Sequence, residues 1–160
     1  MLVIRHSCFP PSSPASVAST LLIFAIGVGM MGGAAADELF TGHLGVTPID
    51  APLRPLVTGN GDAWGTLVGR HLTVSGHFAG LQGPATKIRL HAGSTTGVRG
   101  TPFGDLEGTT GTNGIVSGSL DLTEEQVAAL RAGHVYLQLD SLIAPAGNLW
   151  GWLVPAEASR

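Results

Sequence analysis

Short segments in which apolar and polar residues alternate are the feature that most constrains the fold of this chain. In 71–81, HLTVSGHFAGL, the apolar residues Leu72, Val74 and Phe78 alternate with polar ones, and KIRLH in 87–91 alternates in the same way. Successive side chains of a strand point to opposite faces, so this period of two indicates strands with one buried face. Similar segments recur between turns rich in Gly and Pro. The pattern predicts an all-β fold, a β-sandwich of seven or eight short antiparallel strands.

One short helix is expected to interrupt the strands. The segment LTEEQVAALRAG carries a capping box, with Thr123 followed three residues later by Gln126, and two acidic residues fall in its first turn. Gly133 is placed to end the helix. The prediction is therefore an all-β domain with a single helix near its C-terminal third.

The first residues of the chain have the features of a secretory signal peptide. An apolar run over 21–31 is followed by Ala34-Ala35-Ala36, and these small residues suit cleavage before Asp37. A membrane anchor is the alternative, but a spanning helix needs about 20 apolar residues and this run is much shorter. We therefore expect a signal peptide over 1–36 and a single domain over 37–160. The mature protein would be secreted, periplasmic or at the cell surface, without membrane insertion after cleavage.

Composition narrows the chemistry of the mature domain. Charged residues make up only 12% of the chain and the net charge is −3, which argues against a nucleic-acid partner. The single cysteine, Cys8, lies in the leader. The domain therefore has no disulfide, no thiolate nucleophile and no cysteine ligand for a metal.

The histidines and acids of the domain do not form a recognisable metal or catalytic motif. No H-x-H pair occurs, and the closest two histidines, His71 and His77, are too far apart in sequence to form one. Asp105 and Glu107 fall on one face of a predicted strand, and we interpret them as part of a solvated face. We expect no metal, no cofactor and no enzymatic activity.

Two long segments, 71–93 and 118–153, resemble the CHRD domain, the module named after chordin. The residues that carry the resemblance are Gly80, Leu81, His91, Gln126, Leu130, Gly133, Tyr136, Gly147 and Gly151. The resemblance implies an immunoglobulin-like β-sandwich, an extracellular or exported location, and no enzymatic activity.

Two departures from the CHRD pattern are linked in our interpretation. Arg89 stands where the family has the first histidine of an H-I-H segment, and Asp140 stands where it has a later histidine. Arginine does not ligate metals, so a histidine cluster could not persist here. We expect Arg89 and Asp140 to form a salt bridge between neighbouring strands, on the face away from Ile88 and Leu139.

The last predicted strand carries two tryptophans on one face. The period of two places Trp150 and Trp152 together in GNLWGWLV, where the family pattern has polar residues. Either a loop such as the Pro-rich segment 48–58 covers them, or they form an exposed apolar strip that Tyr136 extends. An exposed strip of this kind would suit contact with a sugar ring or a partner protein.

The sequence thus predicts an exported noncatalytic module, structural or ligand- or protein-binding, with an unidentified extracellular or cell-surface protein or polysaccharide as partner. One alternative is a carbohydrate- or surface-binding module that uses exposed tryptophan. The other is a metal-binding or superoxide-dismutase-like sandwich, which the missing H-x-H pair disfavours. The candidate binding residues are Arg89, His91, Tyr136, Asp140, Trp150 and Trp152.

Overall fold

The computed structural model describes residues 36–48 and 55–156. These residues contain nine strands and one α-helix. The elements are β1 (Glu38–Val46), β2 (Asn60–Val68), β3 (His71–Ala79), β4 (Ala85–Ala92), β5 (Thr101–Gly108), β6 (Gly114–Asp121), α1 (Glu124–Arg131), β7 (Val135–Ser141), β8 (Leu149–Trp152) and β9 (Val154–Pro155). Residues 1–35 of the predicted signal peptide lie outside the described residues.

The strands form where the apolar and polar residues alternate. In β3 the apolar side chains of Leu72, Val74 and Phe78 are buried and most of the polar residues between them are exposed, as predicted. β2 and β3 make the expected hairpin, which turns at Gly69. Gly69 has a φ of 63°, a left-handed conformation that glycine adopts without steric cost.

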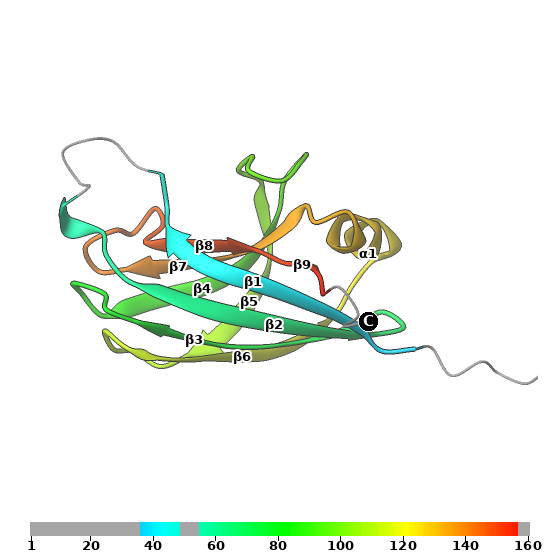
Figure 1. Ribbon diagram of the computed structural model, residues 1–160, viewed down its shortest axis with the longest axis horizontal. Coiled ribbons are helices and arrows are strands. Elements are labelled where there is room, and N and C mark those ends of the chain that lie inside the picture. Colours follow the sequence, from blue (N-terminus) through cyan, green and yellow to red (C-terminus); the bar gives the residue numbers. More distant parts are fainter. Residues whose placement is uncertain (1–35, 49–54, 157–160) are drawn as a thin grey trace, which may run out of the picture. The chain divides into compact units, whose positions relative to one another are not determined.

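The strand pairing closes into a ring. All pairs are antiparallel, and the order β1-β2-β3-β6-β5-β4-β7-β8 returns to β1, while the short β9 is attached to β1 (Figure 1). The structure is therefore an eight-stranded closed barrel with one additional strand. The all-β prediction with one short helix is confirmed. The pairing does not show the two separate sheets of an immunoglobulin-like sandwich. β1 joins β2 to β8 and β5 joins β4 to β6, so the strands are linked into one ring.

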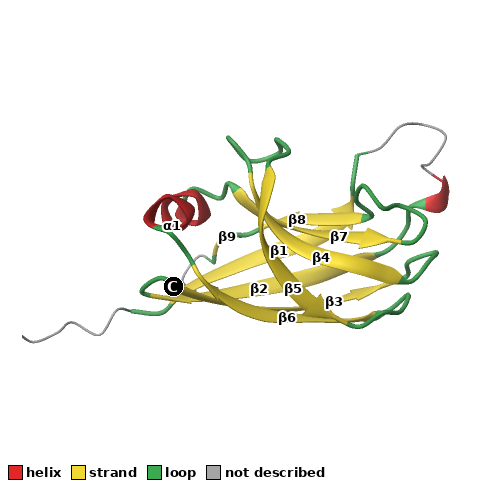
Figure 2. Ribbon diagram, turned by 180° about the vertical axis from the view of Figure 1, so that it is seen from behind, coloured by secondary structure: helices red, strands yellow, loops and turns green. Residues whose placement is uncertain are grey.

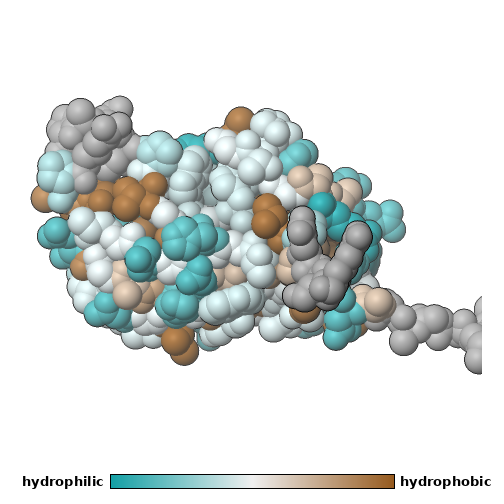
Figure 3. Space-filling view, in the orientation of Figure 1, coloured by the Kyte–Doolittle hydropathy of each residue, from teal (hydrophilic) through white to brown (hydrophobic). Residues whose placement is uncertain are grey.

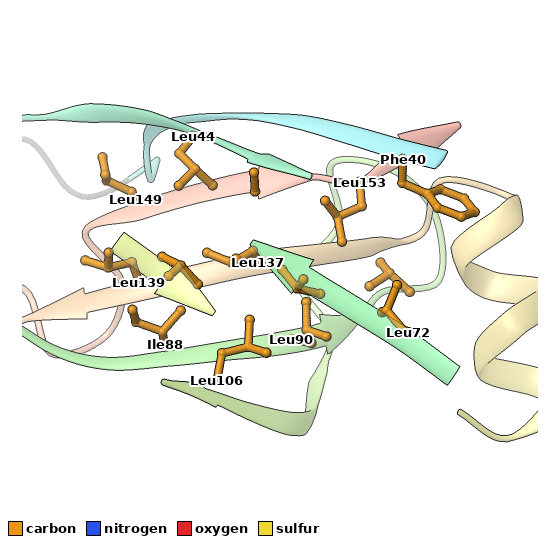
Figure 4. Packing of buried hydrophobic residues seen from close by; sticks show 14 of the residues in the cluster. Phe40, Leu44, Leu72, Ile88, Leu90, Leu106, Leu137, Leu139, Leu149 and Leu153 are labelled. Atoms are coloured by element: carbon orange, nitrogen blue, oxygen red, sulfur yellow. The ribbon is translucent and has the colours of Figure 1, made fainter. Parts of the chain in front are cut away.

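Leucine side chains from all around the ring fill the interior. Figure 4 shows Leu44, Leu90 and Leu137 pointing into the same space from strands that are distant in sequence. The fully buried members include Phe40, Leu44, Leu67, Leu72, Phe78, Leu90, Leu130, Leu137, Leu139, Leu149 and Leu153. The interior is filled mainly by apolar side chains, and the exposed polar groups lie on the outer surface of the barrel.

Helix α1 lies at one end of the barrel (Figure 2). The predicted capping box is present, since Thr123 accepts from the backbone of Gln126 and the Gln126 side chain accepts from the backbone of Thr123. Val127 and Leu130 are buried in the core. No helix in the described part of the chain is both long enough and apolar enough to cross a membrane.

Candidate functional site

The predicted site residues lie together on the outer face of β4, β7 and β8. Register pairs Arg89 with Gln138 and His91 with Tyr136, and β8 continues both rows with its two tryptophans. We call this surface the covered face; it consists of Arg89, His91, Tyr136, Gln138, Asp140, Trp150 and Trp152.

The predicted ion pair between Arg89 and Asp140 is confirmed. Nη2 of Arg89 donates to Oδ2 of Asp140, diagonally across β4 and β7. The Asp140 side chain is 3% exposed and the Arg89 side chain 25%, so the pair is largely removed from water. Gln138, which sequence reasoning missed, donates to Oδ1 of Asp140 at 2.8 Å. Gln138 could have been predicted as a partner, because residues two apart on a strand, such as Gln138 and Asp140, point to the same face.

His91 is buried against Tyr136 and held by a backbone carbonyl. The two rings stack with centroids 4.9 Å apart, and Nδ1 of His91 lies 3.1 Å from the carbonyl oxygen of Gly100. Burial lowers the pKa of His91, and the charges of Arg89 and Arg99 act in the same direction. The Gly100 carbonyl and Asp140 oppose this lowering of the pKa. The neutral imidazole is favoured, with its Nδ1–H donating to the carbonyl.

The loop 93–100, between β4 and β5, covers this cluster. Tyr136 is 1% exposed, and its hydroxyl accepts from the backbone N–H of Gly100 at 3.1 Å. The guanidinium of Arg99 lies 5.7 Å from the ring centre of Trp150 and donates to the carbonyl of Ala146. Figure 1 shows this loop projecting on the outer side of β7 and β8.

The tryptophan strip is therefore not an open surface. Trp150 and Trp152 are half-buried and Tyr136 is buried, so of the two alternatives the covered one holds and the exposed strip extended by Tyr136 does not. Among the described residues the covering segment is the loop 93–100. Of the segment 48–58, which the sequence suggested as a cover, residues 49–54 lie outside the described part. The loop could not be identified from the sequence because its contacts with β7 and β8 are all distant along the chain.

A second polar cluster lies on the outer face of β1, β2 and β3. Register places His43, Asp62 and His77 side by side across the three strands. Oδ1 of Asp62 lies 3.0 Å from Nδ1 of His43, and Oδ2 lies 3.7 Å from Nε2 of His77. Trp64, two residues along β2, is 5.6 Å from His77 between ring centres. We call this surface the open face: His43, Asp62, Trp64 and His77.

The open face was missed in the sequence, and its residues do not form a recognised metal site. Within 36–48 and 55–156, no three or more His, Cys, Asp or Glu side chains are arranged to hold a metal ion. Asp105 and Glu107 are exposed, in agreement with their interpretation as a solvated face.

A shallow depression of about 260 Å³ lies between Trp64 of the open face and Trp152 of β8. Its lining is Thr41, Gly42, His43, Asp62, Ala63, Trp64, Trp152 and Val154. Trp152 reaches this side of the barrel because β8 approaches β1 closely. A Cβ added at Gly151 would lie 2.6 Å from the carbonyl oxygen of His43. The depression therefore combines two indoles with a carboxylate and an imidazole, all accessible from solvent.

The comparisons with known proteins give one finding. The family model of the CHRD domain matches residues 46–153, which take in every element from β2 to β8. No curated protein and no solved structure matches the chain. The match spans more than half of the sequence and agrees with the resemblance carried by the helix and the strand that follows it. The chain therefore belongs to the CHRD domain family.

Proposed function

We propose that this chain is an exported, noncatalytic module that binds a partner at the cell surface or outside the cell. The CHRD family is a noncatalytic domain family, which supports a binding role. The apolar run 21–31 followed by Ala34-Ala35-Ala36 supports export.

The observation that carries the proposal is the solvent-accessible depression beside the open face. Trp64 is 46% exposed there, although a large indole is usually mostly buried. Aromatic side chains give a large contact area for little loss of conformational freedom, and they are enriched in binding surfaces. An exposed tryptophan beside hydrogen-bonding groups is therefore what a binding module would present.

The covered face is the weaker candidate for first contact with a partner. A partner that touched Tyr136 or His91 would have to displace the loop 93–100 and the hydrogen bonds of Gly100. We assign His91 and Tyr136 to holding that loop in place, and Arg89 and Asp140 to a mutual, largely buried ion pair. A direct binding role for them stays a prediction, whereas Trp152 contributes to both surfaces.

Export is tested by expressing the full chain and sequencing the N-terminus of the material recovered outside the cytoplasm. We expect the sequence to begin at Asp37. A protein that keeps its leader and stays in the membrane fraction would contradict the export proposal.

Binding is tested by incubating this exported protein with isolated cell envelopes and with extracellular matrix material, and then sedimenting them. We expect the wild-type protein to sediment with at least one of these materials. Trp64→Ala should remain in the supernatant, while Val68→Ala, an exposed apolar change on the same strand, should behave as wild type. A protein that sediments with none of the materials would contradict the proposal.

A further inference from the structure

The depression between Trp64 and Trp152 has walls of two different kinds. The indoles lie on β2 and β8, on either side of β1, so they form an apolar boundary on two sides. Asp62 and His43 supply hydrogen-bonding groups between them. Thr41 of β1 pairs with Trp64 on one side and with Val154 on the other, which continues the lining along the strand.

Asp62 is held in place without being shut off from solvent. His43 and His77 contact its two carboxylate oxygens from the neighbouring strands, which restrains the direction in which the carboxylate points. The Asp62 side chain nevertheless keeps 46% of its surface exposed. A carboxylate oxygen can accept more than one hydrogen bond, so both oxygens remain available to a ligand that has hydroxyl donors.

This combination matches the chemistry of a sugar ring. A pyranose has an apolar C–H face, which packs on an indole, and an edge of hydroxyls, which donate to a carboxylate or bond with an imidazole. Pockets that enclose a small molecule usually measure about 300–1,000 Å³, and this depression is smaller and open. It is better suited to one or two rings of a polymer that lies across the strands than to an enclosed metabolite.

Charge selects among saccharides. The chain has a net charge of −3, and the central hydrogen-bonding group is a carboxylate. Sulfated polysaccharides and polyuronates would meet like charge at Asp62, which is unfavourable at close range. A neutral saccharide meets no such repulsion.

A large protein partner fits this surface less well. Specific protein interfaces bury about 800 Å² on each partner around an apolar centre. Over the middle of β1 and β2 the surface is mainly pale or hydrophilic, and hydrophobic side chains are isolated from one another (Figure 3).

Another depression, of about 390 Å³, lies where β4 and β5 diverge, but its lining of Ala, Thr, Lys, Ile, Leu, Glu and Gly offers no aromatic ring.

We propose that the depression binds a neutral saccharide, with Trp64 and Trp152 packing against sugar rings and Asp62 accepting hydrogen bonds from their hydroxyls. This inference rests on the proposed binding function and names its ligand class. His43 and His77 are positioning residues that fix the direction of the Asp62 carboxylate.

The experiment measures binding of the exported protein to insoluble cellulose and chitin by depletion from solution. Soluble oligosaccharides of the same sugars serve as competitors, and dextran sulfate serves as the acidic contrast. We expect binding to at least one neutral polymer, competition by its own oligosaccharide, and none by dextran sulfate.

Three variants locate the binding. Trp64→Ala should weaken it by about tenfold or more, as expected for an aromatic residue central to a contact. Asp62→Asn should weaken it severalfold, because a neutral amide accepts weaker hydrogen bonds than a carboxylate. Val68→Ala, which lies on the outer face of β2 away from the depression, is the matched control and should bind as wild type. Circular dichroism and thermal unfolding check that each variant is folded, and Asp62→Asn keeps the side-chain shape if Trp64→Ala is unstable.

The outcomes separate the two proposals. Absence of binding to every neutral polymer, or full binding by both Trp64→Ala and Asp62→Asn, would overturn the saccharide inference. If the protein still sediments with cell envelopes in the presence of the oligosaccharides, the binding function stands and its ligand is a different one. If it binds neither envelopes nor polymers, both proposals fail.

Discussion

The covered face and the open face use the same kinds of residues in opposite ways. Each combines aspartate, histidine and tryptophan in rows that run across three neighbouring strands. On the covered face Asp140 and Tyr136 are almost completely buried: Gly100 of the loop 93–100 bonds to Tyr136, and Arg89 and Gln138 bond to Asp140. On the open face Asp62 and Trp64 remain about half exposed.

Burial of a row, and not its composition, decides what its polar groups do. A buried carboxylate must be paired and hydrogen-bonded, so on the covered face polarity serves stability. An exposed carboxylate keeps lone pairs free for a ligand, at little consequence for stability. If this division holds, removing polar groups from the covered face should cost more stability than removing them from the open face.

The largest expected effect is that of Asp140→Ala. The change leaves Arg89 without its carboxylate and Gln138 without its acceptor, inside a largely buried cluster. Loss of one partner of a buried pair costs about 3–5 kcal/mol, and we expect about 3 kcal/mol because Arg89 keeps some contact with water. Urea unfolding followed by circular dichroism measures the change in the free energy of unfolding.

The matched control for this change is Asp121→Ala. Oδ1 of Asp121 lies 2.9 Å from Nδ1 of His71, and both side chains are mostly exposed. We expect a change of about 0–1 kcal/mol in the free energy of unfolding. Equal losses in the two variants would show that burial does not separate the two kinds of pair.

A smaller effect is expected from Gly100→Ala. A Cβ at this position would lie 1.7 Å from the carbonyl oxygen of Ala92, so the loop 93–100 must shift and its bonds to His91 and Tyr136 must break. Overpacking of this kind costs about 1–3 kcal/mol. The same unfolding assay measures it, and acrylamide quenching of tryptophan fluorescence reports the uncovering of the aromatic cluster.

Gly45→Ala is the control for the glycine change. A Cβ added at Gly45 meets nothing within 4 Å. We expect little change in stability or quenching. If Gly100→Ala behaves like Gly45→Ala, the loop 93–100 is not the cover that the structure shows.

The pH dependence of stability should report the burial of His91. Its folded-state pKa is lowered, mainly by burial, so as the pH falls below about 6.5 the unfolded chain takes up the proton first. The free energy of unfolding should therefore decrease with falling pH, from about 6.5 down to the lowered pKa of His91. Urea midpoints at several pH values measure this, and His91→Gln should reduce the slope. An unchanged slope in His91→Gln would contradict the assignment.

The smallest effect is expected from Asp62→Asn. Its contacts with His43 and His77 are solvent-exposed, so we expect about 0–1 kcal/mol in the free energy of unfolding. Thermal and urea unfolding measure it. A loss as large as that of Asp140→Ala would make the open face a structural element and remove the distinction between the two faces.

Local patterns were sufficient to predict most of the strands and the helix. The alternation in β3 and the capping box of Thr123 and Gln126 depend on residues that are close in sequence, so the sequence shows them directly. The pairing of Arg89 with Asp140 was also predicted, because alternation placed each on a known side of its strand and the CHRD pattern brought the two strands together.

The closure of the barrel and the two faces depended on contacts that local patterns do not contain. His43 meets Asp62 only through the register of β1 with β2, which the long connection between these strands leaves open. Likewise, nothing near Gly100 in the sequence shows that its backbone contacts Tyr136. For this reason the sequence left the exposure of the two β8 tryptophans open and did not single out Trp64 of β2, the most exposed indole.

The closed ring also determines when this protein can finish folding. One edge of β1 is occupied by β2, but the other edge is occupied by β8 and β9, from the far end of the chain. β1 therefore cannot complete its hydrogen bonds until β8 and β9, near the end of the chain, are available to pair with it. Folds dominated by such distant pairings form in milliseconds to seconds, and not in microseconds. During synthesis, which proceeds from the N-terminus, β1 would thus lack these partners until the last strands have emerged.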